Sequence, residues 1–165
     1  MKIIEQISFS GHRNVVDRVI LIPNEVDNLI ITGLDSVEKV SILHALATNN
    51  SNSVSIVSKV NSYQVIIWDG SDVPAMMEKL ISLKSIPVLL LIEEAEIGLN
   101  TESQKSFLTK LIRLFPNMQI LASTSSPFIL LELENCAAYN LDTGRLYTDL
   151  YKKKFNDFNQ IVFGI

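Results

Sequence analysis

Three short apolar runs constrain the fold of this chain more than any other feature of its sequence. They are Asn28–Thr32, Val88–Ile92 and Gln119–Ser123, and each is largely apolar at successive rather than alternate positions. A strand of this kind is buried on both faces, which is typical of a parallel sheet covered by helices. Amphipathic helical patterns follow the first two runs, over roughly 36–48 and 102–114. The sequence therefore predicts an α/β fold with a mostly parallel sheet flanked by helices.

Further strands and helices are expected around this sheet. Residues 3–9 and 15–22 show partial alternation and predict strands, which would form an antiparallel N-terminal portion. The β-rich runs 54–57 and 63–68 predict a hairpin with residues 61–62 at its turn. Three more elements complete the prediction: a helix opened by Pro74, a strand over 136–141 ending at the turn Asp142–Gly144, and a short helix over 155–163.

Length, charge and cysteine content limit the class of protein. The 165 residues suit one domain with a proper core, and no linker interrupts them, so a single domain over 1–165 is expected. The net charge of −4 gives no reason to expect direct nucleic-acid binding. The run Pro87–Ile92 is far shorter than the roughly 20 residues of a spanning helix, and the first residues lack a secretory pattern. We therefore expect a cytoplasmic protein with no membrane partner. Cys136, His12 and His44 are too few for a disulfide framework or a zinc site.

The segment after the first buried strand has the layout of a phosphate-binding loop. Such a loop requires G-x-x-x-x-G-K-[ST] between a strand and a helix. Gly33 and Lys39 stand at two of the four fixed positions, while Glu38 replaces the second glycine and Val40 replaces the hydroxyl that holds magnesium. An ordinary capped helix is the other interpretation, because Asp35 and Glu38 fit a capping box. In that case the chain's own carboxylates occupy the place of the anion.

Two acids follow the second buried strand. Glu93 and Glu94 stand directly after it. An apolar strand that ends in two acids is how ATPases place a magnesium-ordering acid and a water-orienting acid. The simpler alternative is a strand that emerges into solvent. The third strand leads into a hydroxyl-rich segment, 123–126, which alone predicts only a loop.

Read in order, the three strand ends resemble the ATP-binding-cassette (ABC)-type ATPases of the structural-maintenance (SMC) and OLD group. These are the "AAA" ATPases of bacterial repair and phage-defence systems. The resemblance covers nearly the whole chain. The phosphate loop of the family reads G-P-N-G-S-G-K-S-T; here Gly33 and Lys39 match it, Asp35 takes the place of the Asn and Ser41 that of the Thr.

The other two motifs of the family can also be recognised in this sequence. Its Walker B strand ends D-E-P-E-x-x-L-H-P, and here Glu93 replaces the Asp and Asn100 replaces the His. Three positions of that motif match: Glu94, Glu96 and Leu99. Its switch segment reads T-T-H-S-P, and the run Ser123–Pro127 keeps this frame with Ser125 in place of the His.

The resemblance implies a P-loop NTPase-like fold and a set of site residues. Glu93 would hold magnesium and Glu94 would be the catalytic residue that orients water. The nucleotide-binding positions implied are Gly33, Asp35, Lys39, Ser41 and Ser125. Other family features are missing. Only 53 residues separate Lys39 from Glu93, which leaves no room for the helical or coiled insertion, and Trp68–Asp72 stands where the L-S-S-G-E signature is expected.

The missing residues favour a pseudo-ATPase over an efficient enzyme. In this interpretation the domain is a binding or regulatory subunit with a protein partner, either a second copy or a larger ATPase, and ATP and magnesium are bound weakly or not at all. Lys39 would then pair with Glu93 or Glu94. The alternatives are a minimal ATP-binding protein with weak ATPase activity and an interaction domain that inherited only the fold.

Overall fold

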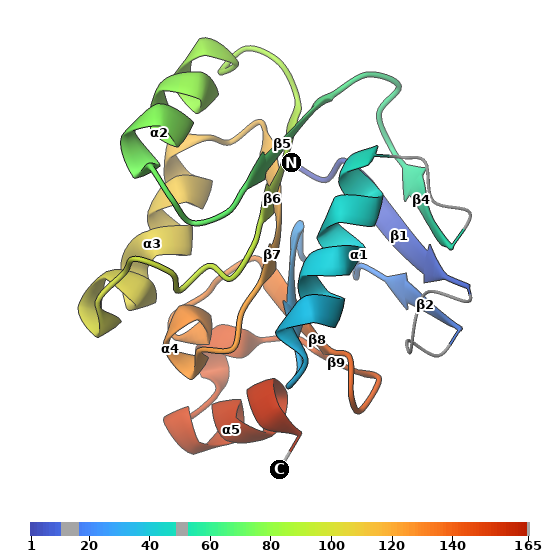
Figure 1. Cartoon of the computed structure of the whole chain (residues 1–165), viewed down its shortest axis with the longest axis vertical. Helices are drawn as coiled ribbons and strands as arrows, with labels where there is room; N and C mark the ends of the chain where they lie inside the picture. Colours follow the sequence, from blue (N-terminus) through green and yellow to red (C-terminus); the bar gives the residue numbers. More distant parts are fainter. Residues whose placement is uncertain (11–16, 49–52, 165) are drawn as a thin grey trace.

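A six-stranded sheet forms the centre of the protein (Figure 1). The computed structural model describes residues 1–10, 17–48 and 53–164. In spatial order the strands are β5 (Gln64–Trp68), β6 (Val88–Ile92), β7 (Met118–Ser123), β3 (Asn28–Thr32), β8 (Cys136–Asn140) and β9 (Arg145–Tyr147). Neighbouring strands pair in parallel except β8 and β9, which are antiparallel. The predicted α/β fold with a mostly parallel sheet is confirmed.

The central strands are buried on both faces, as their apolar runs predicted. Every residue of β3, β6, β7 and β8 is buried. Because successive side chains of a strand point to opposite faces, Ile30 joins the core on one side of β3 while Leu29 and Ile31 join the core on the other. Two separate hydrophobic cores therefore lie on the two faces of one sheet.

Helices cover both faces of this sheet. One core takes side chains from four helices: α2 (Val73–Ser82), α3 (Thr101–Leu114), α4 (Pro127–Leu130) and α5 (Phe155–Phe163). The other takes them from α1 (Ser36–Thr48). None of the described helices is both long and apolar enough to cross a bilayer. The short α4, the strand β9 and a 3₁₀ turn over Leu150–Lys152 had no counterpart in the sequence prediction.

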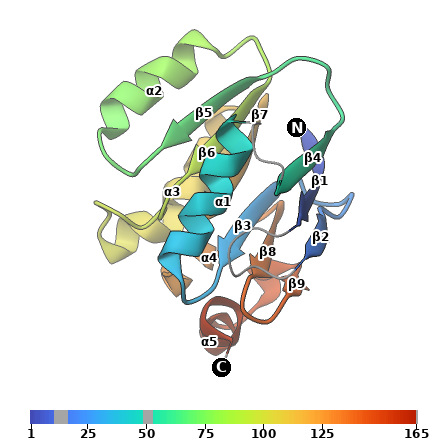
Figure 2. The same cartoon turned by 45° about the vertical axis from the view of Figure 1, so that its right-hand side comes forward.

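A second, antiparallel sheet packs beside α1 (Figure 2). Its strands lie in the order β2 (Arg18–Leu21), β1 (Ile4–Phe9) and β4 (Val54–Ser58). The expected antiparallel N-terminal portion is thus present. Residues 15 and 16, where the second strand was expected to begin, lie outside the described residues.

The predicted hairpin between the two β-rich runs after α1 is wrong. β4 pairs with β1 in the small sheet, whereas β5 pairs with β6 in the central sheet. Asn61 and Ser62 supply no glycine for the tight primed turn that a two-residue hairpin needs. Each strand instead pairs with a strand distant in sequence, and Ile66 and Trp68 of β5 join the core under α2.

Candidate functional site

The loop between β3 and α1 carries the chain's own carboxylates on its amide groups. The Leu34 N–H donates to Oδ2 of Asp142 at 2.8 Å, and the Glu38 N–H donates to Oδ1 of Asp35 at 3.1 Å. Asp35 therefore caps α1, as one of the two interpretations of the sequence expected, but the reciprocal bond of a capping box, from the Asp35 N–H to Glu38, is not found among the described residues. Amides before a helix and in its first turn are the groups that a phosphate loop offers to an anion. Here two of them already have anionic partners.

Lys39 is fully buried at the centre of the site. Its side chain is 0% exposed, and Nζ donates to the carbonyl of Gly33 at 2.7 Å, the carbonyl of Thr124 at 3.1 Å and Oγ of Ser125 at 2.5 Å. An ammonium group has three N–H donors, so protein acceptors use all of them. Burial lowers the pKa of Lys39, and the nearby carboxylate of Glu96 opposes that shift.

The expected pairing of Lys39 with one of the two acids after β6 is not found among the described residues. Glu93 turns toward α1, where its Oε1 lies 2.6 Å from Nε2 of His44. Glu94 adopts a left-handed backbone with φ 44°, and its N–H donates to Oγ of Ser123 at 2.9 Å. The acid that would order magnesium and the acid that would orient water therefore have different surroundings.

The switch segment after β7 is fixed by Glu96. Oε1 of Glu96 accepts the N–H of Ser125 at 2.7 Å, and its Oε2 accepts the hydroxyl of Thr124 at 2.6 Å. On the other side, the hydroxyl of Ser126 donates to Oε1 of Gln104 at 2.6 Å. Three consecutive residues of this segment are thus held by α3 and the loop before it, and Lys39 also binds the segment.

The residues present fit a bound magnesium nucleotide poorly. Val40 has no hydroxyl for the metal, and the hydroxyl of Ser41, one position later, donates to the carbonyl of Glu38 at 2.9 Å. No group of three or more potential metal-ligating side chains is found in the part of the chain that the structure describes. The amides of Leu34 and Glu38, the Lys39 ammonium and the Ser41 hydroxyl have protein partners, so phosphate oxygens would have to displace them.

The structure brings together some of the expected site residues and separates others. Gly33, Lys39 and Ser125 are joined by hydrogen bonds. Asp35 binds the Glu38 amide at the start of α1, whereas Ser41 lies within α1 and binds the carbonyl of Glu38. Asp142 was missed, although one signal could have found it. It follows a buried strand, β8, that is parallel to β3, and the carboxyl ends of parallel strands meet at one edge of a sheet.

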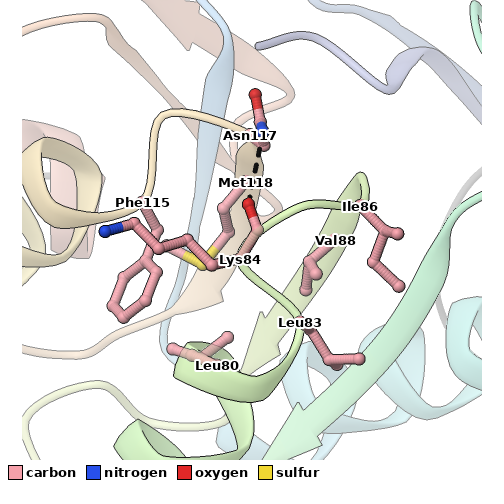
Figure 3. A pocket seen from close by; sticks show the side chains of 8 residues that line it. All are labelled: Leu80, Leu83, Lys84, Ile86, Val88, Phe115, Asn117 and Met118. Carbon is pink, nitrogen blue, oxygen red and sulfur yellow. Dashed lines mark hydrogen bonds between the residues drawn. The ribbon is translucent and has the colours of Figure 1, made fainter.

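An apolar hollow at the opposite edge of the sheet is too small for a nucleotide (Figure 3). Its lining comes from the ends of α2 and α3 and the starts of β6 and β7: Leu80, Leu83, Lys84, Ile86, Val88, Phe115, Asn117 and Met118. The enclosed space is about 10 Å³, which is the minimum for one water molecule. It is a packing gap.

The P-loop NTPase-like architecture of the chain has a counterpart among solved structures. The solved structure of cbiO1 from Clostridium perfringens, described as part of the ABC transporter complex cbiONQ, matches with a TM-score of 0.55 over 88% of this chain and 87% of that chain. The two sequences are 10% identical, so the likeness concerns the fold alone. No family model and no curated protein matches the chain.

Proposed function

We propose that this chain is a pseudo-ATPase: an ABC-ATPase-like domain that does not hydrolyse ATP and acts as a binding or regulatory subunit. The observation that carries the proposal is that all three N–H donors of the Lys39 ammonium are bound to protein acceptors. A lysine that is to hold phosphates must have N–H donors to give, and here two carbonyls and a hydroxyl accept all three. Release of those donors would leave buried carbonyls unpaired, at a cost of roughly 1–3 kcal/mol each.

The surroundings of Lys39 support the same conclusion. The loop amides of Leu34 and Glu38 are bound to carboxylates, and Glu93 is paired with His44. Switch segments of GTPases are ordered by the terminal phosphate; here the switch segment is held by Glu96. A domain that neither binds nor releases a phosphate keeps one conformation. Such a domain suits a constant binding surface better than a conformational cycle driven by ATP hydrolysis.

The proposal extends to the partner and the setting. We place the chain beside the SMC and OLD group, as a subunit of a bacterial phage-defence or DNA-repair assembly whose partner is a protein, either a second copy or a larger ATPase. The membership of cbiO1 in a multi-subunit complex supports a partner protein in general terms.

Equilibrium binding of ATP to the purified chain tests the proposal. Titration calorimetry with and without Mg²⁺ should show no saturable binding with a dissociation constant below about 1 mM, which corresponds to roughly −4 kcal/mol. A thermal scan gives an independent readout, because a ligand at 100 times its dissociation constant stabilises by about 2.7 kcal/mol. Magnesium-dependent ATP binding that Lys39→Met abolishes would contradict the proposal.

Glu94 favours a second candidate, a minimal ATP-binding protein with weak ATPase activity. Its half-buried carboxylate accepts no hydrogen bond from the described residues and lies near enough to Lys39 to raise the lysine pKa. A water-orienting acid needs this freedom. Phosphate release from ATP by the wild-type chain, lost in Glu94→Gln, would establish this candidate; equal release by both proteins would reject it.

A further inference from the structure

Asp142 lies over the phosphate loop because β8 ends beside β3. The two strands are parallel and in register from Asn28 and Cys136 onward. Just beyond them, the Leu141 N–H donates to the carbonyl of Thr32 at 3.0 Å. The next residue is therefore delivered to the start of the loop. A Cβ added to Gly33, whose φ is 134°, would stand 3.2 Å from Oδ2 of Asp142.

Asn140 fixes the turn that carries this carboxylate. Its Oδ1 accepts the N–H of Thr143 at 2.8 Å and the hydroxyl of the same residue at 3.1 Å. Its Nδ2 donates to the carbonyls of Ile161 at 2.9 Å and Val162 at 3.3 Å, in the last turn of α5. Asn140 is 0% exposed. The turn is thus attached to α5 through a buried amide.

The end of β3 is attached to the same helix. The hydroxyl of Thr32, also 0% exposed, donates to the carbonyl of Ile161 at 2.7 Å. One carbonyl of α5 therefore accepts from both Thr32, just before the loop, and Asn140, just before the turn. The position of Asp142 relative to Leu34 is set by three elements, β3, β8 and α5, and not by the exposed turn alone.

A carboxylate held in this way competes with any external anion for the loop. A group in the same chain acts at an effective concentration in the millimolar range or above. It also repels phosphate, since like charges at the same donors disfavour one another. Glycine at position 33 leaves room for this carboxylate, because the added Cβ would come within 3.2 Å of it.

We infer that Asp142 is a built-in anion ligand of the phosphate loop, positioned by Asn140 and α5, and that it makes the loop reject phosphate. The inference rests on the proposed function and names the residue that excludes the nucleotide. Asp35, on the Glu38 amide, is a helix cap of a kind found in many proteins. Asp142 is different because it reaches the loop from another strand, 108 residues away in sequence.

Charge-matched substitutions test this inference. Asp142→Asn removes the charge and keeps the shape, Asp142→Ala removes the acceptor, and Asp149→Asn makes the same change of charge at another exposed aspartate, one that pairs with Lys152. Each protein is titrated with pyrophosphate while the backbone amide resonances of Leu34 and Glu38 are followed by NMR. Amide hydrogen exchange of Leu34 is measured in the same samples, and circular dichroism checks folding.

The expected result is a gain in pyrophosphate affinity that is confined to substitutions at position 142. Asp142→Ala should bind pyrophosphate at least about tenfold more tightly than the wild type, which is about 1.4 kcal/mol, with shifts at Leu34 and Glu38. Its Leu34 amide should exchange at least tenfold faster. Asp142→Asn should show a smaller gain, and Asp149→Asn should match the wild type within about twofold.

An unchanged affinity and unchanged Leu34 exchange in Asp142→Ala would overturn the inference and leave the proposed function standing. Saturable pyrophosphate shifts at Leu34 in the wild type, with a dissociation constant below about 1 mM, would instead overturn the proposed function.

Discussion

The two halves of the site, the phosphate loop with Lys39 and the tip of β6 with Glu94, differ in how fully their polar groups are paired. Lys39 is 0% exposed with three acceptors, and the loop amides of Leu34 and Glu38 have carboxylate partners. Glu94 is half-buried, and within the described residues its carboxylate accepts no hydrogen bond. The side of the site that would hold the anion is closed by the chain, while the side that would orient water is open.

This contrast indicates which half of the site contributes to the stability of the fold. A buried ammonium without partners is very costly, so Lys39 is tolerated at this position because protein groups accept its hydrogen bonds. A half-exposed carboxylate has water as a partner and requires no such replacement. We therefore expect substitutions in the closed half to change stability and substitutions in the open half to leave it unchanged.

The largest effect is expected at Lys39. Lys39→Ala leaves a cavity and unpaired buried carbonyls at Gly33 and Thr124, and should lower the free energy of unfolding by about 4 kcal/mol in urea denaturation. Lys39→Met keeps most of the volume and should lower it by about 2 kcal/mol, which separates packing from hydrogen bonding. A loss below about 1 kcal/mol in Lys39→Ala would mean that the closed half is not held by this residue.

A matched pair of acids compares the two halves, because Glu96 binds Ser125, the hydroxyl partner of Lys39 in the closed half, whereas Glu94 lies in the open half. Glu96→Gln weakens two hydrogen bonds to the switch segment, from the Ser125 N–H and the Thr124 hydroxyl, and should cost about 1.5 kcal/mol. Glu94→Gln makes the same chemical change where no such bond exists and should stay within about 0.5 kcal/mol of the wild type. Equal losses in the two variants would remove the distinction between the halves.

A smaller effect is expected at the helix cap. Asp35→Ala removes the acceptor of the Glu38 N–H and should lower the free energy of unfolding by about 1 kcal/mol. Asp35→Ser restores a capping oxygen without the charge and should recover most of that loss. If serine fails to recover it, the charge of Asp35 beside Lys39 matters more than the cap.

The pH dependence of stability provides the finest comparison. Because burial lowers the pKa of Lys39 below its ordinary 10.5, the unfolded chain holds this proton at pH values where the folded chain has already released it. Stability rises with pH wherever the unfolded state binds more protons. The free energy of unfolding of the wild type should therefore increase, relative to Lys39→Met, as pH approaches 10.5. A constant difference across that range would contradict a desolvated lysine.

How much of this could be predicted from the sequence depends on the distance over which each contact acts. The buried strands and α1 follow from runs of apolar residues that are local in the chain, and the cap at Asp35 requires only the spacing to Glu38. The pairing of β4 with β1 was missed because strand partners are chosen by burial across the whole domain. The contact between Lys39 and Ser125 could not be predicted, because 86 residues separate them and the sequence showed only that their motifs follow one another in the expected order.

The sequence by itself determined that position 33 begins a phosphate-loop layout and that a lysine follows six residues later in the first turn of a helix. It could not determine what that loop and that lysine bind. The tertiary structure decided this, because the groups that occupy them come from other strands. Asp142 arrives from the end of β8 and the carbonyl of Thr124 from the end of β7. The physical reason is that parallel strands gather their carboxyl ends at one edge of the sheet, where polar groups far apart in sequence find one another.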